Sequence, residues 1–443
     1  MMPEICWIAS GGHMSPHPLM ILPFVALLLA IALMPFIHKH WWEHHYPKVA
    51  VGLGAITVLY YLLVLQNPVR LFHVGQEYVS FIALIGSLFV VAGGIHIRVK
   101  GESTPLINCI YLAVGAVLAN IIGTTGASML LIRPWIRSNK YRITTFHIVF
   151  FIFIVSNVGG CLTPIGDPPL FLGYLKKIPF LWTLEHLWEA WLIATVLLIG
   201  IFYVFDSRNF KRAPKPIVEK ETSQETWKIE GWHNFIFVAV IIGAVFMESP
   251  WREIVMLIAS IASYKSTHRD VHNANDFNFT PIKEVAWLFL GIFATMVAAL
   301  DYLELHSLEM GINTPMKFYW ITGSLSAVLD NAPTYLTFLT TSVSLHADPV
   351  SGAHLSVDNA KDIAYYLSAH PLELIAISLG AVFFGSMTYI GNGPNFMVKS
   401  IADQAKIHTP SFFGYVFKYS LPILIPVFLL ISILYFSPWA ILK

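Results

Sequence analysis

Long apolar runs separated by short polar stretches recur along the whole chain. Most runs have roughly 20 residues, the length that an α-helix needs to cross the hydrocarbon core of a bilayer. The runs fall at about 19–37, 47–65, 78–97, 105–132, 144–175, 187–205, 232–248, 251–264, 284–303, 316–345, 371–398 and 413–436. This pattern predicts an all-α polytopic membrane protein that is embedded in the lipid bilayer.

Composition agrees with that class. The chain is 56% hydrophobic and only 12% charged, about half the charged fraction of a soluble domain. The formal net charge of +1 gives no reason to expect nucleic acid as a partner. The three cysteines (Cys6, Cys109 and Cys161) are scattered and predict neither a disulfide framework nor a zinc site. No Lys or Arg precedes Lys39, so we interpret the first run as a retained helix and not as a secretory signal.

Two runs do not have the features of simple spans. Basic residues flank the run 105–132 on both sides, at Arg98 and Lys100 before it and in "RPWIRSNKYR" after it. Short basic loops favour the cytoplasmic side, so both ends of this run should lie inside. A re-entrant hairpin over about 105–137, turning at "GTTGAS" (123–128), satisfies this requirement. The run 316–345 has the same shape, with its turn at "LDNAP" (329–333).

The two hairpins produce a consistent topology. They place 20 of the 27 Lys and Arg residues on the cytoplasmic side and both termini outside. The cytoplasmic stretches are then 38–48, 98–104, 133–142, 206–231, 265–283 and 399–418. The alternative, in which both runs are ordinary helices, would put the basic cluster 133–142 outside.

An internal repeat connects the two halves. The segment "GCLTPIGDPPLF" (160–171) matches "GSMTYIGNGPNF" (385–396) at six of twelve positions, at an offset of 225 residues. In this alignment Asp167 faces Asn392. The two hairpin turns align at an offset of about 206, which pairs Thr124-Thr125 with Asp330-Asn331.

The repeat divides the chain into five parts. We expect N-terminal scaffold helices at 1–77, a first repeat at 78–205, a cytoplasmic linker at 206–231, connecting helices at 232–282 and a second repeat at 283–443. Each repeat contains one hairpin and one broken helix, at about 144–175 and 371–398. The charge-derived topology makes the two repeats inverted copies. Inverted repeats with interrupted helices are typical of secondary transporters, whose site lies at the midplane between the repeats.

The breaks contain the candidate chemistry. Backbone groups that a broken helix leaves free inside a membrane must face a cavity or a ligand. Asp167 lies in the first break and Asp330 at the second hairpin turn, with no Lys or Arg near either. Intramembrane carboxylates usually mark an ion or proton path. The expected ion- or substrate-binding residues are Thr124, Thr125, Ser156, Asn157, Thr163, Asp167, Asp330, Asn331, Thr388, Asn392 and Asn395.

These residues suit a monovalent cation because they all offer oxygen ligands. We expect Na⁺ at Asp330, Asn331, Asp167 and Asn157. Burial favours the protonated form of a carboxylate, so one of the two Asp residues could hold a proton when the cation leaves. The alternative for each Asp is a simple helix cap.

Histidines are weaker candidates. His96 and His147 fall near span ends, where structural hydrogen bonds are expected. The run "HKHWWEHHY" (38–46) is dense in His, as a metal site would be, but its Trp and Tyr residues favour a membrane-interface belt. A membrane-embedded hydrolase using Asp and His would need these residues in one motif, and they are dispersed. We therefore expect no enzyme activity and no cofactor besides Na⁺ as the coupling ion.

Two motifs resemble a known group of transporters. "SNVGGCLTPIGDPPLF" (156–171) and "SAVLDNAPTYLTF" (326–338) are similar to motifs of the ion transporter (IT/ArsB-NhaD) superfamily, and closest to those of NhaD-type sodium/proton antiporters. The superfamily also includes arsenite permeases and citrate and dicarboxylate carriers. The resemblance covers roughly residues 78–436.

The resemblance implies a fold of scaffold helices and two opposed hairpins, often as a homodimer. It implies a multi-pass protein of the bacterial cytoplasmic (inner) membrane, with substrate bound between hairpin tips and broken helices. The site positions that carry over are Asp330 and Asn331, Asp167, Ser156-Asn157, and Thr124-Thr125.

Two functions follow from the sequence. The first is Na⁺(Li⁺)/H⁺ antiport by alternating access, with cation and proton competing for an intramembrane Asp. The alternative is a Na⁺- or H⁺-coupled transporter of an organic anion (citrate or dicarboxylate) or of an oxyanion such as arsenite. The first tip reads Gly-Thr-Thr-Gly and not the Ser-Asn-Thr of dicarboxylate carriers, which favours the antiporter. The second break, "GNGPNF", has no carboxylate and leaves the stoichiometry open.

Overall fold

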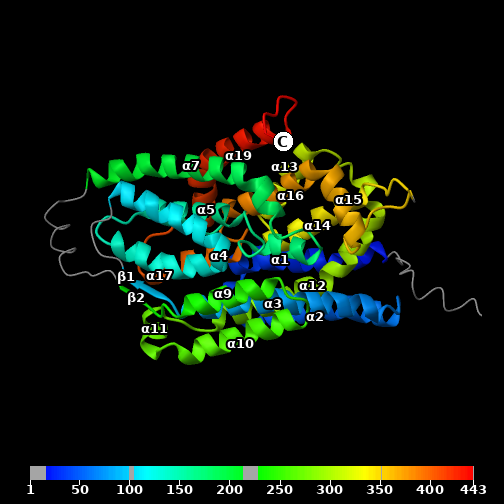
Figure 1. Cartoon of the computed structure of the whole chain (residues 1–443), viewed down its shortest axis with the longest axis horizontal. Coiled ribbons are helices and arrows are strands. Elements are labelled where there is room, and N and C mark those ends of the chain that lie inside the picture. The colour runs from blue at the N-terminus through cyan, green and yellow to red at the C-terminus, as the bar shows by residue number, and fades with distance from the viewer. Residues whose placement is uncertain (1–15, 99–103, 213–227, 351, 443) are drawn as a thin grey trace, which may run out of the picture.

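Helices arranged roughly along one long axis form nearly all of the ordered structure (Figure 1). The computed structural model describes residues 16–98, 104–212, 228–350 and 352–442. In the first half the helices are α1 (Leu22–Ile37), α2 (Lys39–Leu63), α3 (Pro68–Gly93), α4 (Pro105–Ser138), α5 (Thr145–Ile154), α6 (Pro168–Leu175) and α7 (Trp182–Phe210). They follow the apolar runs of the sequence closely.

The second half is also helical. Its helices are α9 (Asn234–Val245), α10 (Trp251–Ser266), α11 (Arg269–Ala274), α12 (Thr280–His306), α13 (Pro315–Ser326), α14 (Asn331–Ser344), α15 (Ala360–Ala369), α16 (Pro371–Phe384), α17 (Gly393–Gln404), α18 (Phe412–Tyr415) and α19 (Leu421–Phe436). Two short strands, β1 (His96–Arg98) and β2 (Lys228–Glu230), pair antiparallel.

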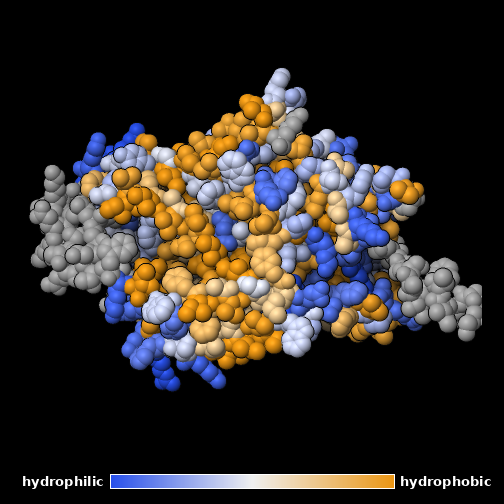
Figure 2. All heavy atoms as spheres, viewed as in Figure 1, coloured by the Kyte–Doolittle hydropathy of each residue, from blue (hydrophilic) through white to orange (hydrophobic). Residues whose placement is uncertain are grey.

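The surface is that of a membrane protein. Seven helices of the described residues are long and apolar enough to cross a bilayer, and eight if the bent pair α15–α16 counts as one span. Hydrophobic side chains gather over the middle of the molecule, while hydrophilic ones lie mainly toward the two ends of the long axis (Figure 2). The exposed apolar residues lie on helices such as α1, α2, α7 and α10. The predicted class, an all-α polytopic membrane protein, is confirmed.

Helix α4 is long enough to span a membrane but is folded back on itself. Gly123 interrupts it with φ 77° and ψ 154°, a conformation that favours glycine. The side chains of Asn108 and Asn139 exchange hydrogen bonds of 2.9 and 3.1 Å. A continuous helix would hold these two residues about 45 Å apart. Helix α4 is therefore a hairpin with its turn at the predicted "GTTGAS" segment.

The second hairpin consists of α13 and α14, which pack against each other and are joined at residues 327–330. Helix α13 also packs closely on α16 of the second broken helix. At residue 323 the glycine permits this contact, because an added Cβ would lie 2.6 Å from the ring of Phe384. The predicted hairpin around "LDNAP" is present.

The first helices of the two predicted repeats, α3 and α12, pack against each other. The rings of Phe81 and Phe289 stack with their centroids 4.6 Å apart. On its other side α12 contacts α2 through small residues, because a Cβ on Gly291 would lie 2.8 Å from atoms of Ala50. Small residues allow such close helix approach in membranes. The residue limits of the scaffold and repeats stay a prediction.

Loops expected on one side of the membrane share one end of the molecule. Strand β1 pairs with β2, and Arg133 forms an ion pair with Asp276 (3.4 Å). At the same end the buried Arg142 pairs with Asp206. The opposite end contains a second ionic cluster, in which Arg70 pairs with Asp301 and Asp358 and Lys176 with Asp358 and Glu77. Which end faces the cytoplasm stays a prediction.

Candidate functional site

Both broken helices have the same backbone plan. A short 3-10 turn follows the first half-helix in each, at Val158–Gly160 and at Gly385–Met387. The second half-helix begins after Asp167 in the first break and after Asn392 in the second. Both residues have extended backbone (φ −136°, ψ 142° and φ −154°, ψ 140°), and neither side chain caps its own helix. These side chains are therefore available for other contacts.

Each break is fixed to the neighbouring hairpin by a threonine. Thr163 donates its hydroxyl proton to the Asn120 carbonyl oxygen at 2.6 Å. Thr388 donates in the same way to the Ala327 carbonyl, also at 2.6 Å. Both threonines thus satisfy carbonyls at the ends of hairpin arms, and neither lies at the centre of the site.

A second matched hydrogen bond defines the register of the repeat. The backbone N–H of Thr124 donates to the Gly166 carbonyl at 2.7 Å, and the backbone N–H of Asn331 donates to the Gly391 carbonyl at 3.2 Å. This pairs Thr124 with Asn331, whereas the sequence alignment paired it with Asp330. Gly123, which has positive φ, is then the equivalent of Asp330 in the first hairpin tip. The expected register was therefore wrong by one residue.

Asp167 lies where the two halves meet. Its side chain is fully buried. One carboxylate oxygen accepts hydrogen bonds from the Thr124 hydroxyl (2.8 Å) and the Asn392 amide (2.9 Å). The other carboxylate oxygen accepts a hydrogen bond from the side-chain amide of Asn331 at 2.6 Å. Both hairpin tips and the second break thus contact this one carboxylate of the first break.

Further predicted residues extend the network. The Asn392 amide also lies 3.2 Å from the Ser156 carbonyl and 3.2 Å from the Asn157 side-chain oxygen. The Asn157 amide donates to the Asn395 side-chain oxygen at 2.6 Å. The Ser156 hydroxyl shares a hydrogen bond of 2.7 Å with Ser128. All of these residues are buried. The structure therefore brings six of the other predicted residues together around Asp167.

Asp330 lies outside this network in the described part of the chain. Its carboxylate accepts a hydrogen bond from the Ala332 amide at 3.0 Å and caps α14. Its side chain is half-buried. The simple helix cap considered for each Asp is thus what Asp330 forms, while Asp167 does not cap its helix. Thr125 lies at the first hairpin tip, beside a small cavity.

The electrostatics around Asp167 are unusual for a buried carboxylate. Its three polar contacts are all with neutral side chains, from Thr124, Asn331 and Asn392. A buried charge without a charged partner costs several kcal/mol. Asn331 adds a buried side-chain oxygen that has no hydrogen-bond partner among the described residues. These oxygens are suited to hold a cation or a proton.

Three helix N-termini converge on the same point. Asp167 and Asn392 precede the first turns of α6 and α17, and Asn331 is the first residue of α14. Helix N-termini carry partial positive charge and favour anions. The site therefore offers oxygen ligands for a cation and a positive potential for an anion within a short distance.

A cavity of about 20 Å³ lies between α3 and the first hairpin tip. This is room for about one water molecule, whereas pockets for small molecules have volumes of roughly 300–1,000 Å³. Asp167 and its contacts Thr124, Asn331 and Asn392 are also buried, so the site is closed in this conformation. The lining residues are Leu84, Ile85, Leu88, Phe89, Ile122, Gly123, Thr124, Thr125, Gly126, Pro164, Ile165, Gly166, Pro168 and Phe171.

Sequence reasoning missed Asn120. This buried residue donates its amide to the Gly159 carbonyl at 2.6 Å and accepts from the Leu162 amide at 2.8 Å. It thereby fixes the loop of the first break to the inner end of the hairpin arm. The signal was an asparagine in an apolar arm, three residues before "GTTG".

The histidines considered as candidates in the sequence make structural contacts. His96 lies 2.8 Å from the Asn275 side-chain oxygen, and His147 lies 3.1 Å from the Asp206 carboxylate. In the run 38–46, two ring nitrogens bond to carbonyls one turn earlier in the same helix.

A comparison with known families assigns the chain to one of them. A family model described as "putative citrate transport" matches residues 13–436. Because the match covers nearly the whole chain, the chain belongs to this family, and it is a membrane transporter. A search of curated proteins gave no match. The family description agrees better with the organic-anion alternative than with sodium/proton antiport.

Proposed function

We propose that this member of the putative citrate transport family is a secondary active carrier of citrate or a related carboxylate, coupled to Na⁺ or H⁺ held at Asp167. The observation that supports it is the buried carboxylate of Asp167, which both hairpin tips and the second break contact at 2.6–2.9 Å. Movement of either hairpin against the breaks would alter these contacts. A site of this kind couples ion occupancy to alternating access.

The cation part of the proposal rests on oxygen ligands. The Asp167 carboxylate, the unpartnered Asn331 oxygen and the Asn157 oxygen are all buried near the centre. Hard monovalent cations prefer such ligands. A proton on Asp167 would neutralise the same charge, so Na⁺ and H⁺ are alternative coupling ions at one position.

The anion part rests on the helix N-termini of α6, α14 and α17 and on the family match. An ionised Asp167 would repel a carboxylate substrate. At about 6 Å and an effective dielectric constant of about 20, this repulsion is about 3 kcal/mol. Binding of a cation or proton removes it and raises anion affinity by about 100-fold. Substrate then binds well only after the coupling ion has bound. Symport requires such an order, because ion and substrate must cross the membrane together.

Substrate entry needs a conformational change. The present cavity of about 20 Å³ is bounded by Leu84 and Leu88 of α3 and by the first hairpin tip. Citrate is many times larger than a water molecule, so the tip must separate from α3 before citrate can enter. We expect the opening to expose Thr124 and Thr125.

Purified protein in vesicles tests the proposal. Labelled citrate uptake is measured with an inward Na⁺ gradient, with an inward proton gradient, and with neither gradient. We expect accumulation with one of the two gradients and simple equilibration without them. Absence of accumulation with both gradients, for citrate and for succinate, would contradict the proposal.

A second function, Na⁺(Li⁺)/H⁺ antiport, is favoured by one observation. Asp167 is a single buried carboxylate with neutral contacts, for which a cation and a proton can compete. A pH dye trapped in the same vesicles distinguishes the two functions. Proton efflux on addition of Na⁺ or Li⁺ without citrate supports the antiporter, and a proton movement that requires citrate supports the carrier.

The inverted-repeat division (78–205 and 283–443) and the placement of β1 and β2 on the cytoplasmic side belong to the same proposal. Single cysteines introduced at Ser266 and Val350, in a chain whose three native cysteines are replaced by serine, test this placement, because these residues lie at opposite ends of the molecule and Val350 is 93% exposed. A membrane-impermeant thiol reagent added to intact cells should label position 350 and spare position 266. The reverse pattern would invert the orientation.

A further inference from the structure

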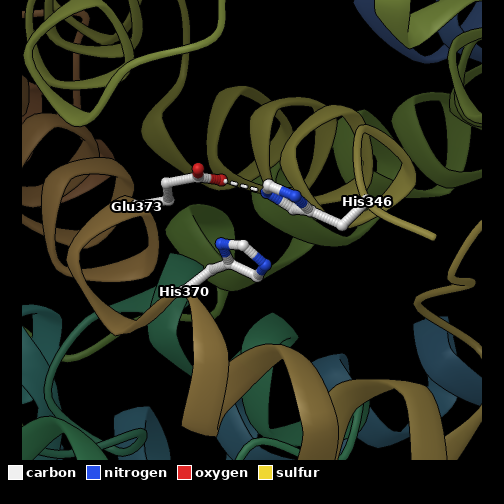
Figure 3. Close-up of side chains that lie close together, drawn as sticks. All are labelled: His346, His370 and Glu373. Atoms are coloured by element: carbon white, nitrogen blue, oxygen red, sulfur yellow. Dashed lines mark hydrogen bonds and ion pairs between the residues drawn. The ribbon is translucent and has the colours of Figure 1, made fainter. Parts of the chain in front are cut away.

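Three potential metal ligands lie together at the end of the molecule opposite to β1 and β2. His346 follows α14, His370 lies at the bend between α15 and α16, and Glu373 belongs to the first turn of α16. Figure 3 shows the carboxylate of Glu373 facing the ring of His346, with the ring of His370 beside them. None of these residues belongs to the network around Asp167.

The ligand atoms of the three residues lie close to one another. One atom from each residue is within 4.8 Å of those from the other two. The His346 Nε2 atom is 3.0 Å from a Glu373 carboxylate oxygen. The two imidazole rings stack with their centroids 3.4 Å apart and their planes inclined by 13°. The three ligand atoms are therefore close enough to share one ion once the two stacked rings turn toward it.

The carboxylate is held in place by a second layer of hydrogen bonds. The Ser342 hydroxyl lies 2.5 Å from the Glu373 carboxylate and 2.6 Å from the Tyr366 hydroxyl. Oriented carboxylates of this kind are a feature of metal sites, where outer hydrogen bonds fix the ligands. The side chains of His346 and Glu373 are 21% and 10% exposed, so an ion can reach them from water.

We propose that His346, His370 and Glu373 form a binding site for a divalent transition-metal ion of the Zn²⁺ type. Two imidazoles and one carboxylate are a ligand set that Zn²⁺ accepts, with water in the fourth position. Mg²⁺ and Ca²⁺ prefer sites made of oxygen alone. Metal binding replaces the hydrogen bond between His346 and Glu373 by two metal–ligand bonds.

The site connects the second hairpin and the second broken helix, whose relative movement would alter the contacts of Asp167. His346 is attached to the outer end of the second hairpin, and Glu373 to the first half of the second broken helix. A bound ion would join them and restrict their relative movement. This consequence rests on the proposed function, whereas metal binding itself does not. We expect Zn²⁺ on that side of the membrane to slow transport.

Metal titration of the full-length protein in detergent tests the site directly. Zn²⁺ binding is measured by calorimetry, and Co²⁺ binding by the visible absorption of a four-coordinate ion. We expect one ion per chain in the wild type and at least about tenfold weaker binding in His370→Gln, which is a loss of about 1.4 kcal/mol. His370→Gln leaves the contacts of Glu373 with His346 and Ser342 in place, and its metal-free melting temperature verifies its fold.

The matched control is His354→Gln. His354 lies between His346 and His370 along the chain, and its Nδ1 bonds to the Ser344 carbonyl at 2.9 Å, outside the cluster. This variant should bind metal like the wild type. Equal binding by the wild type and His370→Gln, or no Co²⁺ absorption band in the wild type, would overturn the proposal.

Vesicle transport then tests the consequence. Zn²⁺ added on the side of the cluster should reduce citrate uptake by the wild type and His354→Gln, and spare His370→Gln. If uptake is absent without metal, the proposed function fails while the titration still decides the site. If the metal binds and uptake is unchanged, the restriction of movement is wrong.

Discussion

The two helix breaks have nearly the same backbone and different chemistry at one position. Thr163 and Thr388 make equivalent hydrogen bonds of 2.6 Å to the hairpins, and Asp167 and Asn392 both precede the second half-helix. Only the first break has a carboxylate. The comparison teaches that the repeated backbone supplies the same geometry to both breaks, while a carboxylate at this position belongs to the first break alone.

Asp167→Asn makes the two breaks alike and should have the largest effect. The variant keeps the size of the side chain but removes the charge that we propose to hold the coupling ion. Loss of one partner from a buried charge interaction costs about 3–5 kcal/mol, so gradient-driven uptake should fall by about two to four orders of magnitude. The control is Asp270→Asn, at a residue whose side chain is 86% exposed. Uptake at the wild-type rate in Asp167→Asn would refute a coupling role for this carboxylate.

Exchanging the two residues moves the charge to the other break. In Asp167→Asn/Asn392→Asp the new carboxylate lies within hydrogen-bond distance of position 167. It also faces the Asn157 side-chain oxygen, which is an acceptor. We therefore expect partial recovery, to about tenfold below the wild-type rate. A double variant no better than Asp167→Asn would show that the charge works only in the first half.

Alanine at the two equivalent glycines, Gly166 and Gly391, compares how tightly the two loops are folded. A Cβ on Gly166 would lie 2.2 Å from the Gly160 carbonyl oxygen, whereas one on Gly391 would lie 2.7 Å from two carbonyl oxygens. Overpacking of this kind costs about 1–3 kcal/mol and sometimes more. Both variants should melt earlier in detergent, Gly166→Ala more so. Gly200→Ala has nothing within 4 Å of its Cβ and should melt like the wild type.

Removing the threonine hydroxyls tests whether the two breaks are anchored equally. Thr163→Val and Thr388→Val each delete the hydrogen bond to a hairpin carbonyl. They also delete the hydrogen bonds that the hydroxyl accepts from backbone amides of its own loop, from Gly166 in the first break and from Ile390 and Gly391 in the second. We expect each to lower the free energy of unfolding by at least about 1 kcal/mol, with additive effects in the double variant because the two hydroxyls share no hydrogen-bond partner. Thermal unfolding measures the change. A loss confined to one variant would show that the matched geometry hides unequal stability.

The smallest effect should come from the outer ends of the broken helices. Lys176, directly after α6, is buried and lies 2.6 Å from both Asp358 and Glu77. Helix α17 instead carries an exposed pair, Lys399–Asp403. Asp358 is about one-third exposed, so solvent screening should keep the effect of Asp358→Asn below about 1 kcal/mol, and Asp403→Asn should have almost none.

The contribution of Asp358 to the stability of the fold depends on pH, and the direction of this dependence is defined. Burial alone would raise the pKa of Asp358, but Lys176 and Arg70 outweigh it and hold this pKa well below its usual range. The carboxylate therefore stabilises the fold at full strength above about pH 4, near the pKa of an unfolded Asp, and loses this contribution as the pH falls through the depressed value. The difference in melting temperature between wild type and Asp358→Asn should be equal at pH 7 and pH 5. A difference that disappears already at pH 5 would contradict this.

The backbone features of the site could be predicted because they depend on local sequence. Glycine and proline at matched spacing indicated both breaks, and basic residues at both ends of one apolar run indicated the hairpin that turns at Gly123. The register of the hairpin tips was one residue off because polar residues were aligned with each other. The hydrogen bonds of Gly166 and Gly391 follow backbone geometry instead.

Long-range partners could not be predicted in the same way. Asp167 and Asp330 look equivalent in the sequence, and the distinction depends on which side chain caps its own helix. The Asn331 amide that reaches Asp167 is 164 residues away along the chain. The cluster at His346 and His370 likewise depends on a bend of 96° between α15 and α16. The local sequence did not predict this bend.

The contact between Asp167 and Asn392 has a consequence for how such a protein can arise. Two identical chains related by a twofold axis would carry the same residue at both of these positions. They could place two acids or two amides against each other at the axis, and never one of each. In one polypeptide the two positions can differ. The acid–amide pair at 2.9 Å is therefore a contact that two identical chains could not form.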